Sequence, residues 1–261
     1  MMSCPIPHGD KNLIVTFSNG SRWDLQNNQY DVSIMLNTVA CYFYQLNAEL
    51  CFSGKVSITC WDIDYPLTEW NATDPTCRTI YLASDSLYWS QQVYQLAHEL
   101  THYFIRGTQD DHNNWFYEAL AELASNYFLL KMAGNCKNSS DQRFQQYASS
   151  LSSYQQQTSM YEAPDIDDVS LWLRKNESYL LSHKEARCLN AQVAKLLFPY
   201  FQKEKDIWNI LLFAPHQNTC LADLFLPWEK AIPDQCAYLR RHIEHFRSVF
   251  YPQGTGCSNS I

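Results

Sequence analysis

The chain of 261 residues lacks the features that mark several large classes of protein. No apolar run approaches the roughly 20 residues that a membrane-spanning helix needs, and residues 1–8 have no apolar segment of the kind found in secretory signals. The net charge is −8 and no basic patch is visible, so neither nucleic acid nor a membrane is an expected partner. No C-x-x-C pair occurs, which argues against a separate cysteine-based zinc module.

What the chain does contain is typical of a folded globular protein. Hydrophobic residues make up 46% of it and aromatic residues 15%, enough for the core of one large domain or of one domain with a closely packed second lobe. Ten cysteines and four N-x-S/T sequons, at Asn19, Asn71, Asn138 and Asn176, would suit a secreted protein with disulfides. Because no signal peptide is recognisable, we expect a cytoplasmic protein, and secretion with disulfides is the alternative.

The most informative stretch is His98-Glu99-Leu100-Thr101-His102, in a segment whose apolar residues recur at helical spacing. In a helix, His98 and His102 lie one turn apart on the same face, where two imidazoles can bind one metal ion. Glu99 projects about 100° further round the helix axis. It can therefore reach a water molecule on the ion without being a ligand itself. This is the H-E-x-x-H pattern of zinc peptidases.

A third ligand is expected from the next helical segment, 115–133, which begins with the run W-F-Y-E-A-L-A-E. A short polar connection joins the two segments, so the helices should pack antiparallel. Glu118 and Glu122 lie one turn apart on a helix that is otherwise largely apolar. Two carboxylates on a buried face need a compensating charge, which a zinc ion held by His98 and His102 would supply.

These two segments resemble the gluzincin zinc metallopeptidases, whose second ligand helix typically reads W-x-x-E-G/A-x-A. The match covers about residues 85–130 of the chain. The resemblance implies that Glu118 completes the ligand set of one Zn²⁺ ion and that Glu99 is the general base. It also implies that Glu122 orients the zinc-bound His98 from behind, and that the substrate is a peptide or a protein.

The same resemblance gives expectations for the rest of the site. An extended peptide would pair with an edge strand above the metal, a mode of binding that reads the backbone more than the side chains. The residues assigned to this edge strand are Thr79, Ile80, Tyr81 and Leu82. A group that stabilises the oxyanion or donates a proton is expected from the C-terminal part of the chain. The candidates, in order of preference, are Arg187, Tyr179 and His183.

The fold class predicted is α+β. The expected core is zincin-like, made of one helix, a small antiparallel sheet, the H-E-x-x-H helix and the Glu118 helix, and an α-helical lobe follows it. Strands are expected over 12–18, 55–63 and 78–83, a loop over 66–75, and helices over 31–50, 168–182, 184–204, 206–213, 221–231 and 234–250, with Pro199 kinking or ending the second of the last five. The expected divisions are 1–133 for the core with both metal-binding helices, 134–165 for a linker or mobile loop, 166–251 for the helical lobe and 252–261 for a tail.

Two other functions stay open at this point. A zinc hydrolase that cleaves a non-peptide amide, or a narrowly targeted proteolytic effector or toxin, would use the same residues. A catalytically inactive module with a structural zinc would have no use for Glu99. The other histidines are expected at the surface, with His242 and His245 on an exposed face of the last helix. The cysteines are expected to be structural rather than catalytic.

Overall fold

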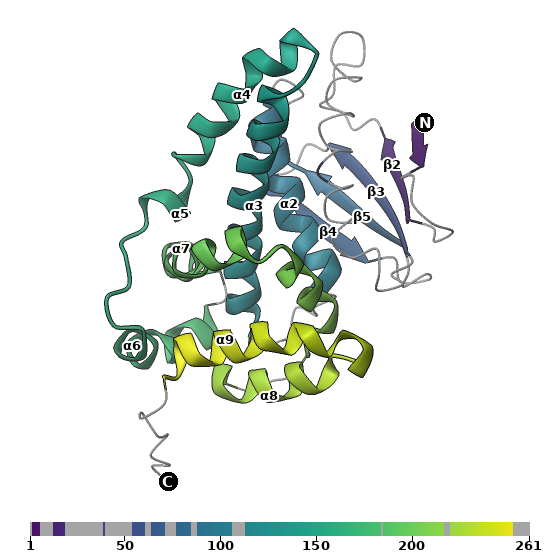
Figure 1. Ribbon diagram of the computed structural model, residues 1–261. Coiled ribbons are helices and arrows are strands. Elements are labelled where there is room, and N and C mark those ends of the chain that lie inside the picture. Colours follow the sequence, from purple (N-terminus) through teal and green to yellow (C-terminus); the bar gives the residue numbers. More distant parts are fainter. Residues whose placement is uncertain are drawn as a thin grey trace.

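The computed structural model describes residues 2–5, 13–18, 39, 54–60, 64–70, 77–84, 88–105, 113–183, 185–216 and 220–252. In this part of the chain a five-stranded sheet packs on helix α2, and further helices lie on the other side of α2 (Figure 1). The molecule therefore has the α+β class predicted from the sequence. The strands are β1 Met2–Pro5, β2 Leu13–Ser18, β3 Gly54–Cys60, β4 Leu67–Trp70 and β5 Cys77–Leu82.

The sheet is mixed, so the prediction of a small antiparallel sheet is wrong. Its order is β1-β2-β3-β5-β4, in which β2, β3 and β5 are parallel while β1 and β4 run antiparallel at the two ends. The predicted edge strand at 79–82 is also wrong, because β4 pairs with the outer side of β5. The edge of the sheet is instead β4, only four residues long, which lies where the sequence suggested a loop.

The side chains of β5 show how the sheet packs on α2. Ile80 and Leu82 are completely buried, and Arg78, two residues earlier on the same face, is only 4% exposed. Arg78 Nη1 donates to the carbonyl oxygen of Tyr103 over 2.8 Å. That carbonyl belongs to the last turn of α2, where backbone oxygens have no partner within the helix. A guanidinium at this end also complements the negative pole of the helix.

Helix α3 is the centre of the helical part, because it contacts α2, α4, α5, α6 and α7. Every residue from Trp115 to Leu129 is buried except Glu118. The helical elements are α2 Trp89–Ile105, α3 Asn114–Lys137, α4 Gln142–Gln155, α5 Ser159–Glu162, α6 Val169–Ser182, α7 Arg187–Lys203, the 3-10 helix η2 Lys205–Phe213, α8 Leu221–Ala231, the 3-10 helix η3 Asp234–Leu239 and α9 Arg240–Phe250.

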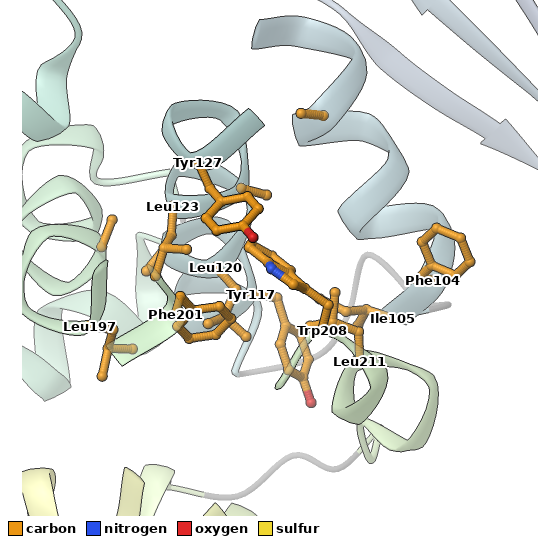
Figure 2. Packing of buried hydrophobic residues seen from close by; sticks show 14 of the residues in the cluster. Phe104, Ile105, Tyr117, Leu120, Leu123, Tyr127, Leu197, Phe201, Trp208 and Leu211 are labelled. Carbon is orange, nitrogen blue, oxygen red and sulfur yellow. The ribbon is translucent and has the colours of Figure 1, made fainter. Parts of the chain in front are cut away.

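A hydrophobic core of aromatic and aliphatic side chains joins α2 and α3 to the C-terminal helices (Figure 2). The ring of Trp208 in η2 lies 5.1 Å from that of Tyr127 in α3 and 4.7 Å from that of Phe201 in α7, measured between ring centroids. Near the start of α3, the hydroxyl of Tyr117 donates to the carbonyl oxygen of Pro215 over 2.5 Å. The expected helical lobe is therefore packed on the core through α3.

The predicted linker at 134–165 is wrong. Helix α3 continues past Gly134 to Lys137, and α4 then packs along α3. The Ser/Gln-rich composition suggested a linker, but the buried side chains of Phe144 and Leu151, two turns apart, give α4 an apolar face. Pro199 likewise does not end its helix, because α7 continues for four more residues to Lys203.

Some predictions fall on other parts of the chain. The helix expected at 31–50 lies, apart from the buried Val39, outside the described residues, and so does the tail after Pro252. No helix among the described residues combines the length and the apolarity that crossing a bilayer requires. Cys136, Cys188 and Cys220 form no disulfide. The cytoplasmic location stays a prediction.

Candidate metal centre

Helix α2 is buried on most of its circumference because it lies between the sheet and α3. One stripe along it remains partly open, and Tyr94, His98 and His102 lie on this stripe. The two histidine side chains are 21% and 27% exposed. The one-turn spacing predicted for His98 and His102 is therefore present, with both imidazoles on the side of α2 that is not covered by packing.

Helix α3 brings Glu118 to the same place. Between Trp115 and Leu129 it is the one residue that is not buried, and its side chain is 22% exposed. The flanking Tyr117 and Ala119 are buried, so packing on both sides sets the rotation of the helix about its axis. The helix therefore has little freedom to turn the Glu118 carboxylate away from α2.

The three side chains converge on one point, and we call them the α2–α3 cluster. Glu118 Oε2 lies 3.2 Å from His98 Nε2, and Glu118 Oε1 lies 3.3 Å from His102 Nε2. The two Nε2 atoms are 3.2 Å apart. Two nitrogens and a carboxylate from facing helices are a donor set that a divalent metal ion can use.

The charges in the cluster are strongly coupled. Burial alone would lower the pKa of His98, but the hydrogen bond and the negative charge of Glu118 outweigh it and raise the pKa to about 9. Burial would raise the pKa of the Glu118 carboxyl, yet the charges and hydrogen bonds of His102 and His98 hold it well below its usual range. The carboxylate is thus strongly favoured as an anion between two groups that can be positive.

Glu99 points toward the sheet, and it lies close enough to His98 for its negative charge to contribute to the raised pKa of that histidine. It is only 4% exposed, and its Oε2 accepts a hydrogen bond of 2.7 Å from the hydroxyl of Thr68 in β4. The same hydroxyl lies 3.3 Å from the backbone oxygen of Glu99. The edge strand and the residue predicted as general base are therefore in direct contact. Thr68 was missed from the sequence because its four-residue strand was read as a loop.

Glu122 does not contact His98 in the way that was predicted. Its Oε2 accepts a short hydrogen bond from the hydroxyl of Tyr94, and its Oε1 accepts one of 3.1 Å from Asn126 Nδ2. Burial raises the pKa of Tyr94, and the charge of Glu122 raises it further, so the phenol is protonated and donates. The hydroxyl of Thr158 in turn donates to Asn126 Oδ1 over 2.6 Å. Glu122 therefore braces α2 and α5 against α3.

The second imidazole nitrogen of His98, Nδ1, does not take part in the contacts of the α2–α3 cluster. His98 Nδ1 is buried and has no hydrogen-bond partner among the described residues. A metal-bound histidine usually donates this N–H to a neighbouring oxygen, which fixes the ring. Here the ring lies instead edge-on to that of His102, with centroids 4.9 Å apart.

The three residues predicted to stabilise the oxyanion or donate a proton lie in two different places. Arg187, the first residue of α7, is exposed, but its positive charge acts on the phenol of Tyr94. Tyr179 and His183 lie at the end of α6 and stack on each other, with ring centroids 4.1 Å apart. The hydrogen bonds of His183 go to Ser182 and to the backbone of Tyr179. Of the three, Arg187 is the one whose charge reaches the side of α2 that carries the cluster.

His242 is buried, so the prediction of an exposed face for it is wrong. Its Nδ1 lies 2.9 Å from the hydroxyl of Tyr200, and its Nε2 lies 3.2 Å from Asp206 Oδ1. With Glu204, these residues form a second group whose potential ligand atoms are close together; we call Glu204, Asp206 and His242 the C-terminal cluster. Arg241 also binds there, with Nη2 3.1 Å from Glu204 Oε2 and 2.9 Å from Asp206 Oδ2.

Comparisons of the chain with protein-family models, with curated proteins and with solved structures gave no match. The function therefore has to be argued from the side chains and their geometry.

Proposed function

We propose that this protein is a zinc-dependent hydrolase of peptide bonds, built on a gluzincin-like pair of helices. The observation that carries the proposal is the convergence of His98, His102 and Glu118 on one point, with the carboxylate of Glu99 on the adjoining residue of the same helix. A structural metal site would have no use for a carboxylate at that position. The resemblance of the two helical segments to the gluzincins supports the same reading.

The residues present fit a zinc ion. Donors at tetrahedral positions about 2.0–2.2 Å from zinc lie about 3.3–3.6 Å from one another. In the α2–α3 cluster the two Nε2 atoms are 3.2 Å apart, and each lies 3.2 or 3.3 Å from a different oxygen of the Glu118 carboxylate, so only a slight opening is needed. Two histidines and one glutamate are also a typical set for catalytic zinc, because three protein ligands leave one position for water or substrate.

Each residue then has a distinct task. Zinc, when bound, would polarise the scissile carbonyl and make a nearby water more acidic. Glu99 would accept a proton from that water and pass it to the nitrogen of the leaving amine. Glu118 and the two histidines would hold the ion. Glu122 would keep the helices together through Tyr94, so that the ligands stay in place.

The substrate would be an extended chain lying along β4. This strand ends the sheet of described strands, and Thr68 within it contacts Glu99. A peptide that adds to β4 by backbone hydrogen bonds would therefore run past the general base. This mode of binding reads the backbone, so we expect cleavage of unfolded or extended segments rather than of folded domains.

The test combines metal analysis with a peptide-library cleavage screen on the wild type and on Glu99→Gln. We expect one zinc per chain in both proteins. The wild type should cleave peptides, and Glu99→Gln should cleave them about 10²- to 10⁴-fold more slowly because it cannot take up the proton. A Glu99→Gln protein with wild-type activity would contradict the mechanism, and a wild type without bound zinc would contradict the proposal as a whole.

The same screen separates the alternatives. A zinc-loaded wild type that cleaves no peptide, and whose Glu99→Gln variant is equally stable and equally loaded, would favour an inactive binding module. Hydrolysis of non-peptide amides or of a single protein only, abolished by Glu99→Gln, would favour the narrower hydrolase or effector. Both outcomes retain the metal site and replace the substrate.

A further inference from the structure

We infer that Thr68 is a positioning residue for the general base, and that the edge strand β4 thereby supplies a side chain to the site. The inference rests on the proposed function, and it concerns the orientation of Glu99 rather than the metal ligands. It is carried by the hydrogen bond of 2.7 Å between the Thr68 hydroxyl and Glu99 Oε2.

The register of the sheet explains why Thr68 meets Glu99. Thr68 pairs with Ile80 of β5, and residues that pair across two strands face the same side of the sheet. Ile80 is completely buried on the side that packs on α2. The hydroxyl of Thr68 therefore points at α2, while the neighbouring Glu69 is exposed and accepts a hydrogen bond of 3.0 Å from the hydroxyl of Tyr81.

A glutamate needs such a contact because its side chain has several rotatable bonds. Among the described residues, the hydrogen bond from Thr68 is the one that the Glu99 carboxylate makes. It engages Oε2, so Oε1 is left as the oxygen that can accept a proton. Threonine is well suited as the donor, because its branched side chain is stiff about χ1 and its strand is fixed by β5. A base displaced by about 1 Å can lose about 10²-fold in rate.

The kinetic test uses three variants of the zinc-loaded full chain. Thr68→Val keeps the shape and removes the hydroxyl, Thr68→Ala removes it with less bulk, and Thr68→Ser keeps it. We expect kcat to fall about 10- to 100-fold in Thr68→Val and Thr68→Ala, because both variants lose the hydrogen bond that orients Glu99. KM should change by less than about twofold, because the proposed substrate contacts on β4 are made by the backbone and not by the Thr68 side chain. Thr68→Ser should stay within about threefold of the wild type.

A second readout needs neither zinc nor activity. We expect the loss in Tm of the metal-free double variant Thr68→Val/Glu99→Ala to be smaller than the sum of the losses of the two single variants, because the second change removes a contact already broken by the first. Additive losses would mean that the two side chains do not interact, and would overturn the inference.

The remaining outcomes are also decisive. A Thr68→Val protein with wild-type kcat would overturn the inference while leaving the proposed function intact. A Thr68→Ser protein as slow as Thr68→Val would assign the effect to packing of the strand and would overturn it as well. A wild type that neither binds zinc nor cleaves peptides would overturn the proposed function, and the role of Thr68 with it.

Discussion

The α2–α3 cluster and the C-terminal cluster look alike by composition and differ in what neutralises their charge. Each brings histidine and carboxylate ligand atoms within 4.8 Å of one another. In the C-terminal cluster, the guanidinium of Arg241 bridges Glu204 and Asp206, and the ring of His242 is held by Tyr200 and Asp206. In the α2–α3 cluster, the carboxylate of Glu118 faces two imidazoles and, among the described residues, no lysine or arginine.

This difference shows why proximity of ligand atoms alone is a weak criterion for a metal site. A buried carboxylate needs a positive partner, and the C-terminal cluster already has a permanent one in Arg241. The described residues give the α2–α3 cluster no permanent cation, so a bound metal ion would be the positive partner of Glu118. The two clusters should therefore respond in opposite ways when zinc is offered or when a carboxylate is neutralised.

The largest expected effect comes from changing one carboxylate to an amide in each cluster. Glu118→Gln should weaken zinc binding by more than about a hundredfold, because even residues that only support a ligand contribute 10- to 100-fold. Asp206→Asn should leave zinc binding unchanged. The measurement is zinc content after dialysis, together with titration of the apo-protein.

Two results would contradict this difference between the clusters. If the wild type binds a second zinc that Asp206→Asn loses, the C-terminal cluster is also a metal site and Arg241 does not exclude the ion. If Glu118→Gln keeps full affinity, then the third ligand lies elsewhere.

A smaller effect, on stability, is expected from Tyr94→Phe, which removes the hydroxyl that donates to Glu122. The buried carboxylate would keep only its partner Asn126, and the free energy of unfolding should fall by about 1–3 kcal/mol. Urea denaturation measures this. Tyr161→Phe, at an exposed tyrosine, is the matched control and should change stability by less than about 0.5 kcal/mol. A Tyr94→Phe protein as stable as the control would mean that Glu122 does not brace the two helices.

The smallest effect concerns the pH dependence of the C-terminal cluster. Burial lowers the pKa of His242, the charge of Asp206 opposes this, and Arg241 adds to the lowering. The folded protein therefore binds fewer protons than the unfolded chain as the pH falls below about 6.5, the usual histidine value. The contribution of His242 to stability should therefore decrease as the pH falls from 7.5 to 5, whereas that of His98, whose pKa is raised, should increase. We expect the free energy of unfolding of the wild type to fall more, or rise less, over this range than that of His242→Gln.

Urea denaturation of the metal-free protein across this range checks the pH prediction. His183→Gln, at an exposed histidine, should keep the wild-type profile. If His242→Gln and His183→Gln lose stability equally steeply as the pH falls, His242 does not govern the acid sensitivity of this lobe.

The convergence of His98, His102 and Glu118 could be predicted from the sequence because it depends mainly on local structure. The spacing of His98 and His102 is a property of any α-helix, and a short connection forces the next helix to pack antiparallel with Glu118 beside them. The described helices other than α4 and α5, and the three strands β2, β3 and β5, also followed from apolar periodicity. Each of these features can be inferred from neighbouring residues, without information on which distant segments of the chain are in contact.

What the sequence did not reveal depends on distant contacts. The strand at Thr68 is too short to show a pattern of its own and exists because it pairs with β5. Glu122 was assigned to His98 by analogy, but Tyr94 on the same stripe of α2 reaches it instead. His242 was predicted to be exposed because arginines flank it in the sequence, yet it is buried and contacts Tyr200 and Asp206. In each case a partner far away in the chain decides the role.

The central position of α3 has a consequence for how the site would fail. Because α3 is enclosed by α2, α4, α5, α6 and α7, its backbone amides around Glu118 should exchange with solvent only when the whole molecule opens. The strand β4, by contrast, pairs with β5 alone among the described strands and can fray on its own. Under the proposed function, Glu99 would then lose its orientation before His98, His102 and Glu118 separate, so a stressed molecule would pass through a state that still holds zinc and no longer cleaves.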